Sequence, residues 1–310
     1  MKRFLIYTSI FLSILILFGV MVAFVGRFDN VNAVYSDNGN IKRIKQKANF
    51  DSLDILFVGN SYCYSGINPA YFDSINIQTF NLGIPTAGPY IYELVVDDYL
   101  RDAKHLPENV FFLISPMTFS SKADNFPAYP IHRYLNQPIS NEKLVLEYGI
   151  VDQYVNLSKK SFVKGIENLK SGIITTAAIS PLENKGYSPS DVVVNDSIVK
   201  NSESLYLDLL KNKLNQDYVQ HLMDLSDRLL AKGVKVTYFE LPTYKLKNYF
   251  NPDYLEDYEG VIEAVLEKYG LVRISPNMSD LNYRNIDHLN ANGATKCTLE
   301  MIRQLNLKKD

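Results

Sequence analysis

Two residues of this chain have the chemistry for nucleophilic catalysis, Ser61 and His288. Ser61 closes the stretch Asp54-Ile-Leu-Phe-Val-Gly-Asn-Ser61, an apolar run that feeds a tight turn. A serine hydroxyl attacks poorly until an adjacent base takes its proton, so a reactive Ser61 needs a histidine beside it. Only His288 lies in a predicted loop between a C-terminal strand and the last helix. Solvated or packed surroundings are expected for the other three histidines, His105, His132 and His221.

The elements that must position these residues follow from hydrophobic patterning. Short apolar runs predict strands at 54–58, 77–81, 110–114, 234–240 and 271–274, and helical spacing predicts helices at 69–74, 89–100, 203–232, 253–269 and 291–305. Strands that alternate with helices indicate an α/β fold. We therefore predict a flavodoxin-like three-layer α/β/α sandwich with a mostly parallel five-stranded sheet. Ligands bind outside the carboxyl ends of such strands, which is where Ser61 and His288 fall.

Three short blocks lie at the ends of predicted strands. They are Gly59-Asn60-Ser61 followed by Gly66-Ile67, then Asn81-Leu82-Gly83, then Asp287-His288-Leu289-Asn290 leading into Gly293-Ala294. In this order they resemble the block pattern of the SGNH/GDSL hydrolase superfamily. The likeness is to membrane-anchored members that act on envelope polysaccharide or in D-alanylation of lipoteichoic acid. It runs from about residue 54 to residue 305, with an unmatched insertion.

The resemblance implies a role for each matched residue. Ser61 corresponds to the nucleophile and His288 to the base, while the backbone amides of Ser61 and Gly83 form an oxyanion hole. Each donor aimed at the developing oxyanion can contribute about 2.7–4 kcal/mol. The family takes a third donor from a Gly-x-Asn-Asp block, which this chain lacks. The equivalent strand ends in Ile114-Ser115-Pro116-Met117-Thr118, so Thr118 or Ser115 would have to substitute.

The acid that should orient His288 also departs from the family's pattern. The family places it three residues before the histidine, where this chain has Asn285. Asp287 is the remaining candidate, but it directly precedes His288. Adjacent side chains usually diverge, so Asp287 can orient the imidazole only if the loop turns sharply. Otherwise a Ser–His dyad, with a main-chain carbonyl holding the ring, would carry the chemistry.

The N-terminus predicts a membrane anchor. Lys2 and Arg3 precede an uncharged run at 4–25, which is long enough to cross a hydrocarbon core of about 30 Å. The positive-inside tendency keeps the two cations cytoplasmic and places the remainder outside the cytoplasm. The rival is a cleaved signal peptide with a site near Val31-Asn32-Ala33. We favour a cytoplasmic stub and anchor at 1–26, a linker at 27–49 and one domain at 50–310. That domain carries an insertion at about 117–201, with helical patterns at 144–155 and 161–169.

Composition narrows the function classes. A formal net charge of -2 offers no basic surface for nucleic acid. The two cysteines, Cys63 and Cys297, lack metal-ligand spacing and are too few for a disulfide framework, which leaves one bridge or two buried thiols. No metal or cofactor is expected. We predict a serine-dependent acyl esterase or O-acyltransferase of the cell envelope. The alternatives are a catalytically degenerate glycan-binding or scaffold protein, or a D-alanylation-type accessory that works with a membrane acyltransferase.

Overall fold

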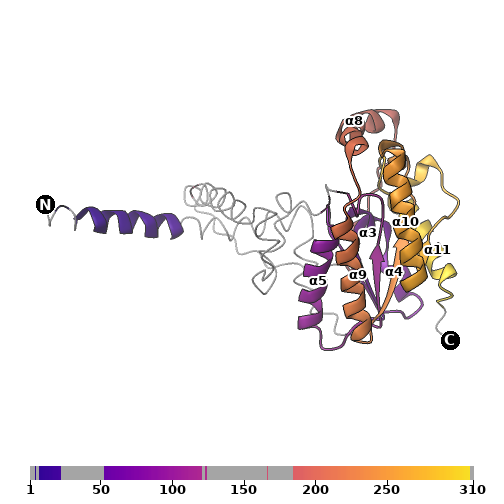
Figure 1. Ribbon diagram of the computed structural model, residues 1–310, viewed down its shortest axis with the longest axis horizontal. Coiled ribbons are helices and arrows are strands. Elements are labelled where there is room, and N and C mark those ends of the chain that lie inside the picture. The colour runs from indigo at the N-terminus through magenta and orange to yellow at the C-terminus, as the bar shows by residue number, and fades with distance from the viewer. Residues whose placement is uncertain are drawn as a thin grey trace. The chain divides into compact units, whose positions relative to one another are not determined.

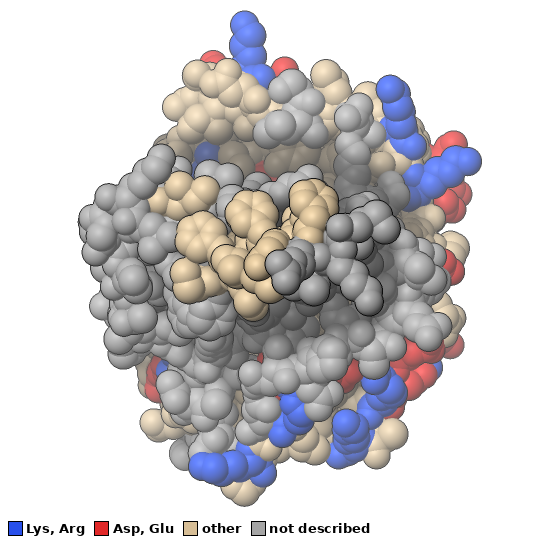
Figure 2. All heavy atoms as spheres, turned by 90° about the vertical axis from the view of Figure 1, so that its left-hand side faces the viewer, with Lys and Arg blue, Asp and Glu red and all other residues tan. Residues whose placement is uncertain are grey.

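The computed structural model describes residues 4, 7–21, 52–120, 123, 166 and 184–307. Residues 52–120 and 184–307 belong to one compact unit (Figure 1). On the face shown in Figure 2, the described Lys and Arg side chains are scattered, with Asp and Glu side chains among them.

Five strands form one sheet in the order β2-β1-β3-β4-β5. They are β1 (Ile55–Gly59), β2 (Thr79–Gly83), β3 (Asn109–Leu113), β4 (Lys235–Glu240) and β5 (Leu271–Arg273). All neighbouring pairs are parallel, whereas the sequence predicted a mostly parallel sheet. This strand order is the flavodoxin-like one. The predicted α/β sandwich is therefore confirmed, with every strand within two residues of its predicted ends.

Helices cover both faces of the sheet (Figure 1). On one face α3 (Ser61–Gly66), α4 (Pro69–Asp73) and α11 (Ala291–Gln304) pack together. On the other, α5 (Pro89–Asp102) packs on α9 (Gln216–Ala231), and α10 (Pro252–Tyr269) joins α9 where the Tyr269 hydroxyl donates to the Met223 carbonyl. The connection from β1 to β2 moves across the sheet in one direction, and the later connections move in the other. Because such connections are right-handed, the helices between β1 and β2 lie on one face and those of the later connections on the other.

Aromatic side chains fill the space between these layers. Phe57, on β1, is fully buried, and its ring centroid lies 5.2 Å from that of Phe72, 5.5 Å from that of Phe111 and 5.8 Å from that of Phe239. Such contacts add about 0.5–1.5 kcal/mol each beyond the burial of their area. The strand that ends at the Ser61 turn is thus held in the most apolar part of the sheet.

The predicted helix at 203–232 is right mainly over its second half, and it is not continuous. The chain instead forms α8 (Asp196–Tyr206), a 3₁₀ segment η3 (Leu207–Lys211), and then α9 from Gln216. Asn215 starts α9, because its side chain accepts the N–H groups of Asp217 and Tyr218. The helix is interrupted before Asn215 because the side chain of that residue caps a new helix, although the helical spacing of apolar residues continues through this position.

The segment after residue 183 covers the edge of β2. The N–H of Asn81 donates to the Lys185 carbonyl at 2.9 Å, and the N–H of Ser188 donates to the Tyr64 carbonyl at 2.8 Å. Gly186 has a φ of +92°, and a Cβ there would lie 1.9 Å from the Asn81 oxygen. Only glycine allows this close approach.

Residues 7–21 are helical, and none of their side chains is charged. Among the described residues, no helix is long and apolar enough to cross a membrane. The predicted span at 4–25 includes residues 5, 6 and 22–25, which lie outside the described residues, so the anchor stays a prediction. The predicted linker at 27–49 also lies outside them, as does most of the insertion, including the helical pattern at 144–155. Of the pattern at 161–169, only residue 166 is described, and it is helical.

Candidate active site

Ser61 is placed by the end of β1 and the start of α3. A Cβ on Gly59 would lie 2.5 Å from the Cβ of Cys63 and 2.7 Å from that of Leu113, so the chain makes this turn only with glycine there. Asn60 then caps α3, accepting the Tyr62 N–H at 3.0 Å through Oδ1. The sequence predicted a turn here rather than the helix, because Ser61–Gly66 has no apolar period. Ser61 is half-buried at the carboxyl edge of the sheet.

Asn81, on β2, fixes the far end of α3. Its side-chain amide donates to the carbonyls of Cys63 and Ile67, both at 2.8 Å. The Cys63 carbonyl also accepts the Ile67 N–H at 3.1 Å, whereas the Ile67 carbonyl, just past the end of the helix, takes its donor from Asn81, which is itself fully buried. The helix that begins with Ser61 is therefore tied to the sheet at both ends.

His288 reaches Ser61 from a tight loop between β5 and α11. Its Nε2 lies 2.7 Å from Ser61 Oγ, within the range for direct proton transfer. The loop is closed by an antiparallel bridge between Tyr283 and Leu289 and by the Arg284 N–H, which donates to the His288 carbonyl at 3.1 Å. The structure thus brings together the serine and histidine that the sequence singled out.

Asn285 makes the sharp turn that Asp287 requires. Its Oδ1 accepts the backbone N–H of His288 at 2.8 Å and that of Asp287 at 3.4 Å. This turn directs the Asp287 carboxylate onto His288 Nδ1, and Asn285 Oδ1 lies 3.2 Å from the same nitrogen. With Nδ1 protonated towards these acceptors, Nε2 is the nitrogen that accepts the proton of Ser61. Asn285 therefore shapes the loop, and Asp287, two residues later, supplies the carboxylate.

Two tyrosines complete the surroundings of the buried Asp287. The Tyr62 hydroxyl donates to Asp287 Oδ2 at 3.2 Å, and the Tyr206 side chain, at the end of α8, also hydrogen-bonds the carboxylate. Burial alone would raise the pKa of Asp287, but the charge of His288 and the hydrogen bonds from His288, Tyr206 and Tyr62 together hold that pKa below its ordinary value. Burial and the Asp287 charge raise the pKa of Tyr62, so it stays a donor. Asp287 is therefore ionised at neutral pH.

Neither tyrosine was predicted. Tyr62 directly follows Ser61, and its ring meets the His288 ring edge-on at 5.0 Å between centroids. Tyr206 lies far from the motif blocks in a chain with 22 tyrosines, so its position carries no signal in the sequence.

The oxyanion side of the site is only partly as expected. The Ser61 N–H lies in the first turn of α3, where amides lack acceptors within the helix. The Gly83 N–H donates to Asn81 Oδ1 at 3.0 Å, so its expected oxyanion role stays a prediction. Thr118 is fully buried, and its Oγ1 accepts the Ser115 N–H at 3.0 Å in the turn after β3. No hydrogen bond among the described residues joins Thr118 or Ser115 to Ser61.

The remaining polar candidates lie apart from this site. Cys63 and Cys297 are both buried thiols, and no disulfide joins them. His221 pairs with Glu93 between α9 and α5, and His132 lies outside the described residues. In the described part of the chain, no group of His, Cys, Asp and Glu is placed to hold a metal ion.

Comparison with known proteins gives only distant similarities. No protein-family model matches the sequence, and a search of curated proteins finds no match. One similar solved structure is a GDSL-like lipase from Bacteroides thetaiotaomicron, with 12% identity, a TM-score of 0.38, and coverage of 92% of this chain and 100% of that one. Another is a Bacteroides fragilis protein described as an acylhydrolase, with 12% identity, a TM-score of 0.39, and coverage of 84% and 93%.

Proposed function

We propose that this chain is an extracytoplasmic serine-dependent acyl esterase or O-acyltransferase that acts on cell-envelope polysaccharide or a related glycan. The observation that carries the proposal is the 2.7 Å contact between His288 Nε2 and Ser61 Oγ, with the Asp287 carboxylate on Nδ1. The uncharged run at 4–25, which we expect to be a single-pass anchor, supports the envelope location. The glycan substrate follows from the resemblance of the three sequence blocks.

In the first half of the reaction Ser61 becomes acylated. Its Oγ attacks the ester carbonyl while His288 Nε2 takes the hydroxyl proton. The Ser61 amide donates to the oxyanion, and Asp287 compensates the positive charge on the imidazole. The carbon–oxygen bond to the leaving alcohol then breaks, and His288 returns the proton to that alcohol. An acyl-serine and a free sugar hydroxyl remain.

In the second half His288 acts as the base again. It takes a proton from water, which gives hydrolysis, or from a sugar hydroxyl, which gives acyl transfer. The incoming oxygen attacks the acyl-serine, and the proton returns to Ser61 Oγ. A membrane acyltransferase that delivers the acyl group would make the chain its accessory. Dependence of turnover on such a co-purified protein distinguishes that form.

Covalent labelling tests the proposal directly. A fluorophosphonate should label the full-length chain at Ser61 and should not label Ser61→Ala. Ser52→Ala is the matched control, because it makes the same change at an exposed serine that precedes β1 and should label like the parent. An unlabelled parent chain, or esterase activity that survives in Ser61→Ala, would refute the serine mechanism.

A glycan-binding role without catalysis is the second candidate. It is favoured by the Gly83 amide, which is engaged with Asn81 rather than directed to an oxyanion. In that case Ser61 resists the fluorophosphonate, while acetylated envelope glycan still binds both the parent chain and Ser61→Ala.

A further inference from the structure

The loop that follows β2 leaves the sheet beside Ser61. The Ile84 N–H donates to the Gly59 carbonyl at 2.8 Å, so the first residue after β2 is bonded to the last residue of β1. From this hydrogen bond the chain runs two residues to Ser61 on one side and two residues to Thr86 on the other, at most about 7 Å in each case. Ser61 and Thr86 therefore lie near each other, outside the carboxyl ends of two neighbouring strands.

Thr86 has a backbone conformation that favours glycine. Its φ is +58°. The Ala87 N–H donates to the Ile84 carbonyl at 3.1 Å, which closes a turn with Pro85 and Thr86 at its centre. A turn with proline at its second position and a positive φ at its third is of type II, and its third position usually holds glycine or asparagine. A β-branched residue there is an outlier, so the turn is strained at Thr86.

The Thr86 side chain contributes little to the packing of the protein. Thr86 is exposed, whereas every other residue of the stretch 79–92 is buried. Within the described part of the chain, its hydroxyl has no hydrogen-bond partner. Strained backbone positions of this kind cluster at active sites and ligand contacts, where the surrounding structure holds them in place. The strain and the unbonded hydroxyl together indicate that Thr86 serves a bound molecule rather than the fold.

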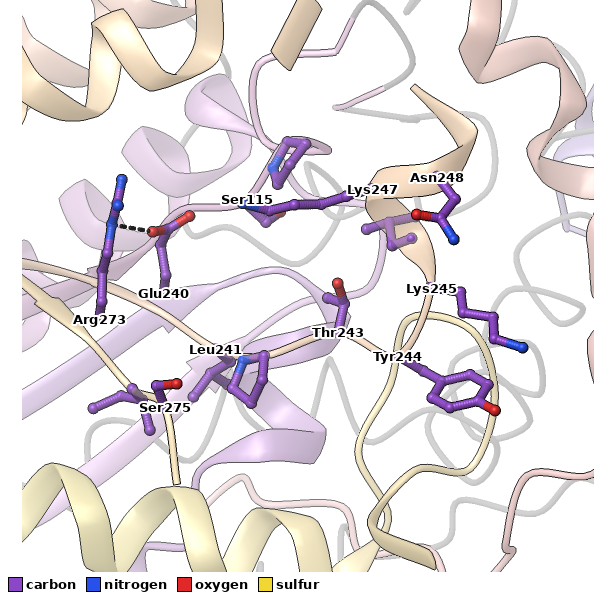
Figure 3. A pocket seen from close by; sticks show the side chains of 14 residues that line it. Ser115, Glu240, Leu241, Thr243, Tyr244, Lys245, Lys247, Asn248, Arg273 and Ser275 are labelled. Carbon is purple, nitrogen blue, oxygen red and sulfur yellow. Dashed lines mark ion pairs between the residues drawn. The ribbon is translucent and has the colours of Figure 1, made fainter. Parts of the chain in front are cut away.

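Several other donors at this edge of the sheet are already bonded within the protein. The Gly83 N–H donates to an acceptor on its own strand. On the other side of β1, Ser115 Oγ lies 3.3 Å from Thr118 Oγ1. Arg273 lines the open pocket that follows β3, β4 and β5, where it pairs with Glu240 at 2.9 Å, the contact dashed in Figure 3. A bound ester would have to displace these partners, whereas the hydroxyl in the turn after β2 has none to displace.

We propose that Thr86 is a substrate-contact residue, whose hydroxyl donates a hydrogen bond to an oxygen of the ester that Ser61 attacks. The inference rests on the proposed function and adds to it a residue outside the group formed by Ser61, His288 and Asp287. The Ser61 amide approaches the ester from the start of α3, and the Thr86 hydroxyl approaches it from the β2 side. The turn presents this hydroxyl before substrate arrives, so no hydrogen bond within the protein breaks on binding.

Three substitutions at Thr86 separate contact with the ester from a structural role. Thr86→Val keeps the branched shape and removes the hydroxyl, so kcat/KM for p-nitrophenyl acetate should fall about fivefold, the scale of one neutral hydrogen bond. Thr86→Ser keeps the hydroxyl and should stay within about twofold of the parent. Thr86→Gly removes the hydroxyl and the strain together, so kcat/KM should fall as in Thr86→Val while the urea midpoint of unfolding does not fall.

Asn76→Gly is the matched control. Asn76 also has a φ of +58° and is exposed, but it lies in the turn that precedes β2, at the opposite end of the same strand. The change should leave kcat/KM at the parent's value. Circular dichroism checks the fold of each variant, and Thr86→Ala replaces Thr86→Val if the latter is unfolded.

Three outcomes would overturn the proposal: Thr86→Val keeps the parent's kcat/KM, Thr86→Ser loses as much as Thr86→Val, or Thr86→Gly lowers the midpoint of unfolding. The last outcome would give the side chain a structural role. Fluorophosphonate labelling of Ser61 separates this proposal from the proposed function. A labelled, active parent that Thr86→Val matches refutes the Thr86 contact alone, whereas an unlabelled, inactive parent refutes the proposed function and the contact with it.

Discussion

Asp287→Asn asks whether the residue adjacent to His288 is the acid of the site. The change keeps the shape of the side chain and removes its charge. Asp287 is only 5% exposed, and its carboxylate faces His288 Nδ1. The positive charge on His288 forms in the transition state, so losing its buried counter-ion, a change worth about 3–5 kcal/mol, raises the barrier. At about 1.36 kcal/mol per tenfold change in rate, the turnover number should fall by about 10²–10⁴-fold.

The presence of Asn285 narrows the expected loss of turnover in Asp287→Asn. In serine proteases with a Ser-His-Asp triad, the same Asp-to-Asn change lowers turnover about 10⁴-fold because the histidine adopts the wrong tautomer. Here Asn285 Oδ1 lies 3.2 Å from His288 Nδ1 and can still accept its proton. The tautomer is kept, so the loss should fall in the lower half of the range, about 10²–10³-fold.

The assay is hydrolysis of p-nitrophenyl acetate, with the rate of fluorophosphonate labelling as a second readout. Asp253→Asn, an exposed acid at the start of α10, is the control and should leave both rates unchanged. Adding Asn285→Asp to Asp287→Asn restores a carboxylate near Nδ1 and should recover at least about tenfold of the lost turnover. An Asp287→Asn enzyme that keeps more than about a tenth of the parent's turnover would refute the reasoning.

Three further changes test the surroundings of the site. Tyr62→Phe removes a donor to Asp287 and should lower the free energy of unfolding at neutral pH by about 1.5–3 kcal/mol. The fold lowers the pKa of Asp287, so urea titrations should show this loss of stability in full above the pKa of a free aspartate. The loss should disappear as the pH falls through the lowered pKa of the folded state. Asn81→Ala leaves the Ile67 carbonyl without its donor and the Gly83 N–H without its acceptor, and should cost about 2–4 kcal/mol in the same measurement, whereas an unchanged midpoint would contradict the role given to Asn81. Gly83→Ala would put a Cβ 2.4 Å from the Tyr64 nitrogen, so α3 must shift, and ester turnover should fall at least about tenfold while circular dichroism stays native.

The sheet could be predicted from the sequence because its strands are buried on both faces. Val110 to Ile114, for example, is a continuous apolar run that fits a covered parallel strand better than a half-exposed one. Helix ends were harder to predict, because a short polar cap sets them. Asn60 starts α3 without any apolar period, and Asn215 starts α9 inside a pattern that otherwise continues.

In the candidate active site too, some residues could be predicted from sequence patterns and others depend on the folded geometry. The order of the sequence blocks was enough to predict that Ser61 and His288 meet, since both follow strand ends at one edge of the sheet. The role of Asn285 was not predictable, because the convergence of two adjacent side chains depends on a hydrogen bond between its Oδ1 and the backbone. The contact of Tyr206 with Asp287 depends on where α8 packs, and nothing local to Tyr206 encodes it.

The segment beside β2 has a consequence for how copies of this protein can associate. An uncovered edge strand is a template onto which another chain can add a strand. Here the Lys185 carbonyl occupies the Asn81 N–H, and the opposite edge is β5, only three residues long and ending in the charged Arg273. Both edges of the sheet therefore discourage strand addition. Association of copies by strand addition at either edge is therefore not expected, and Gly186 would be the position at which a side chain opens the β2 edge.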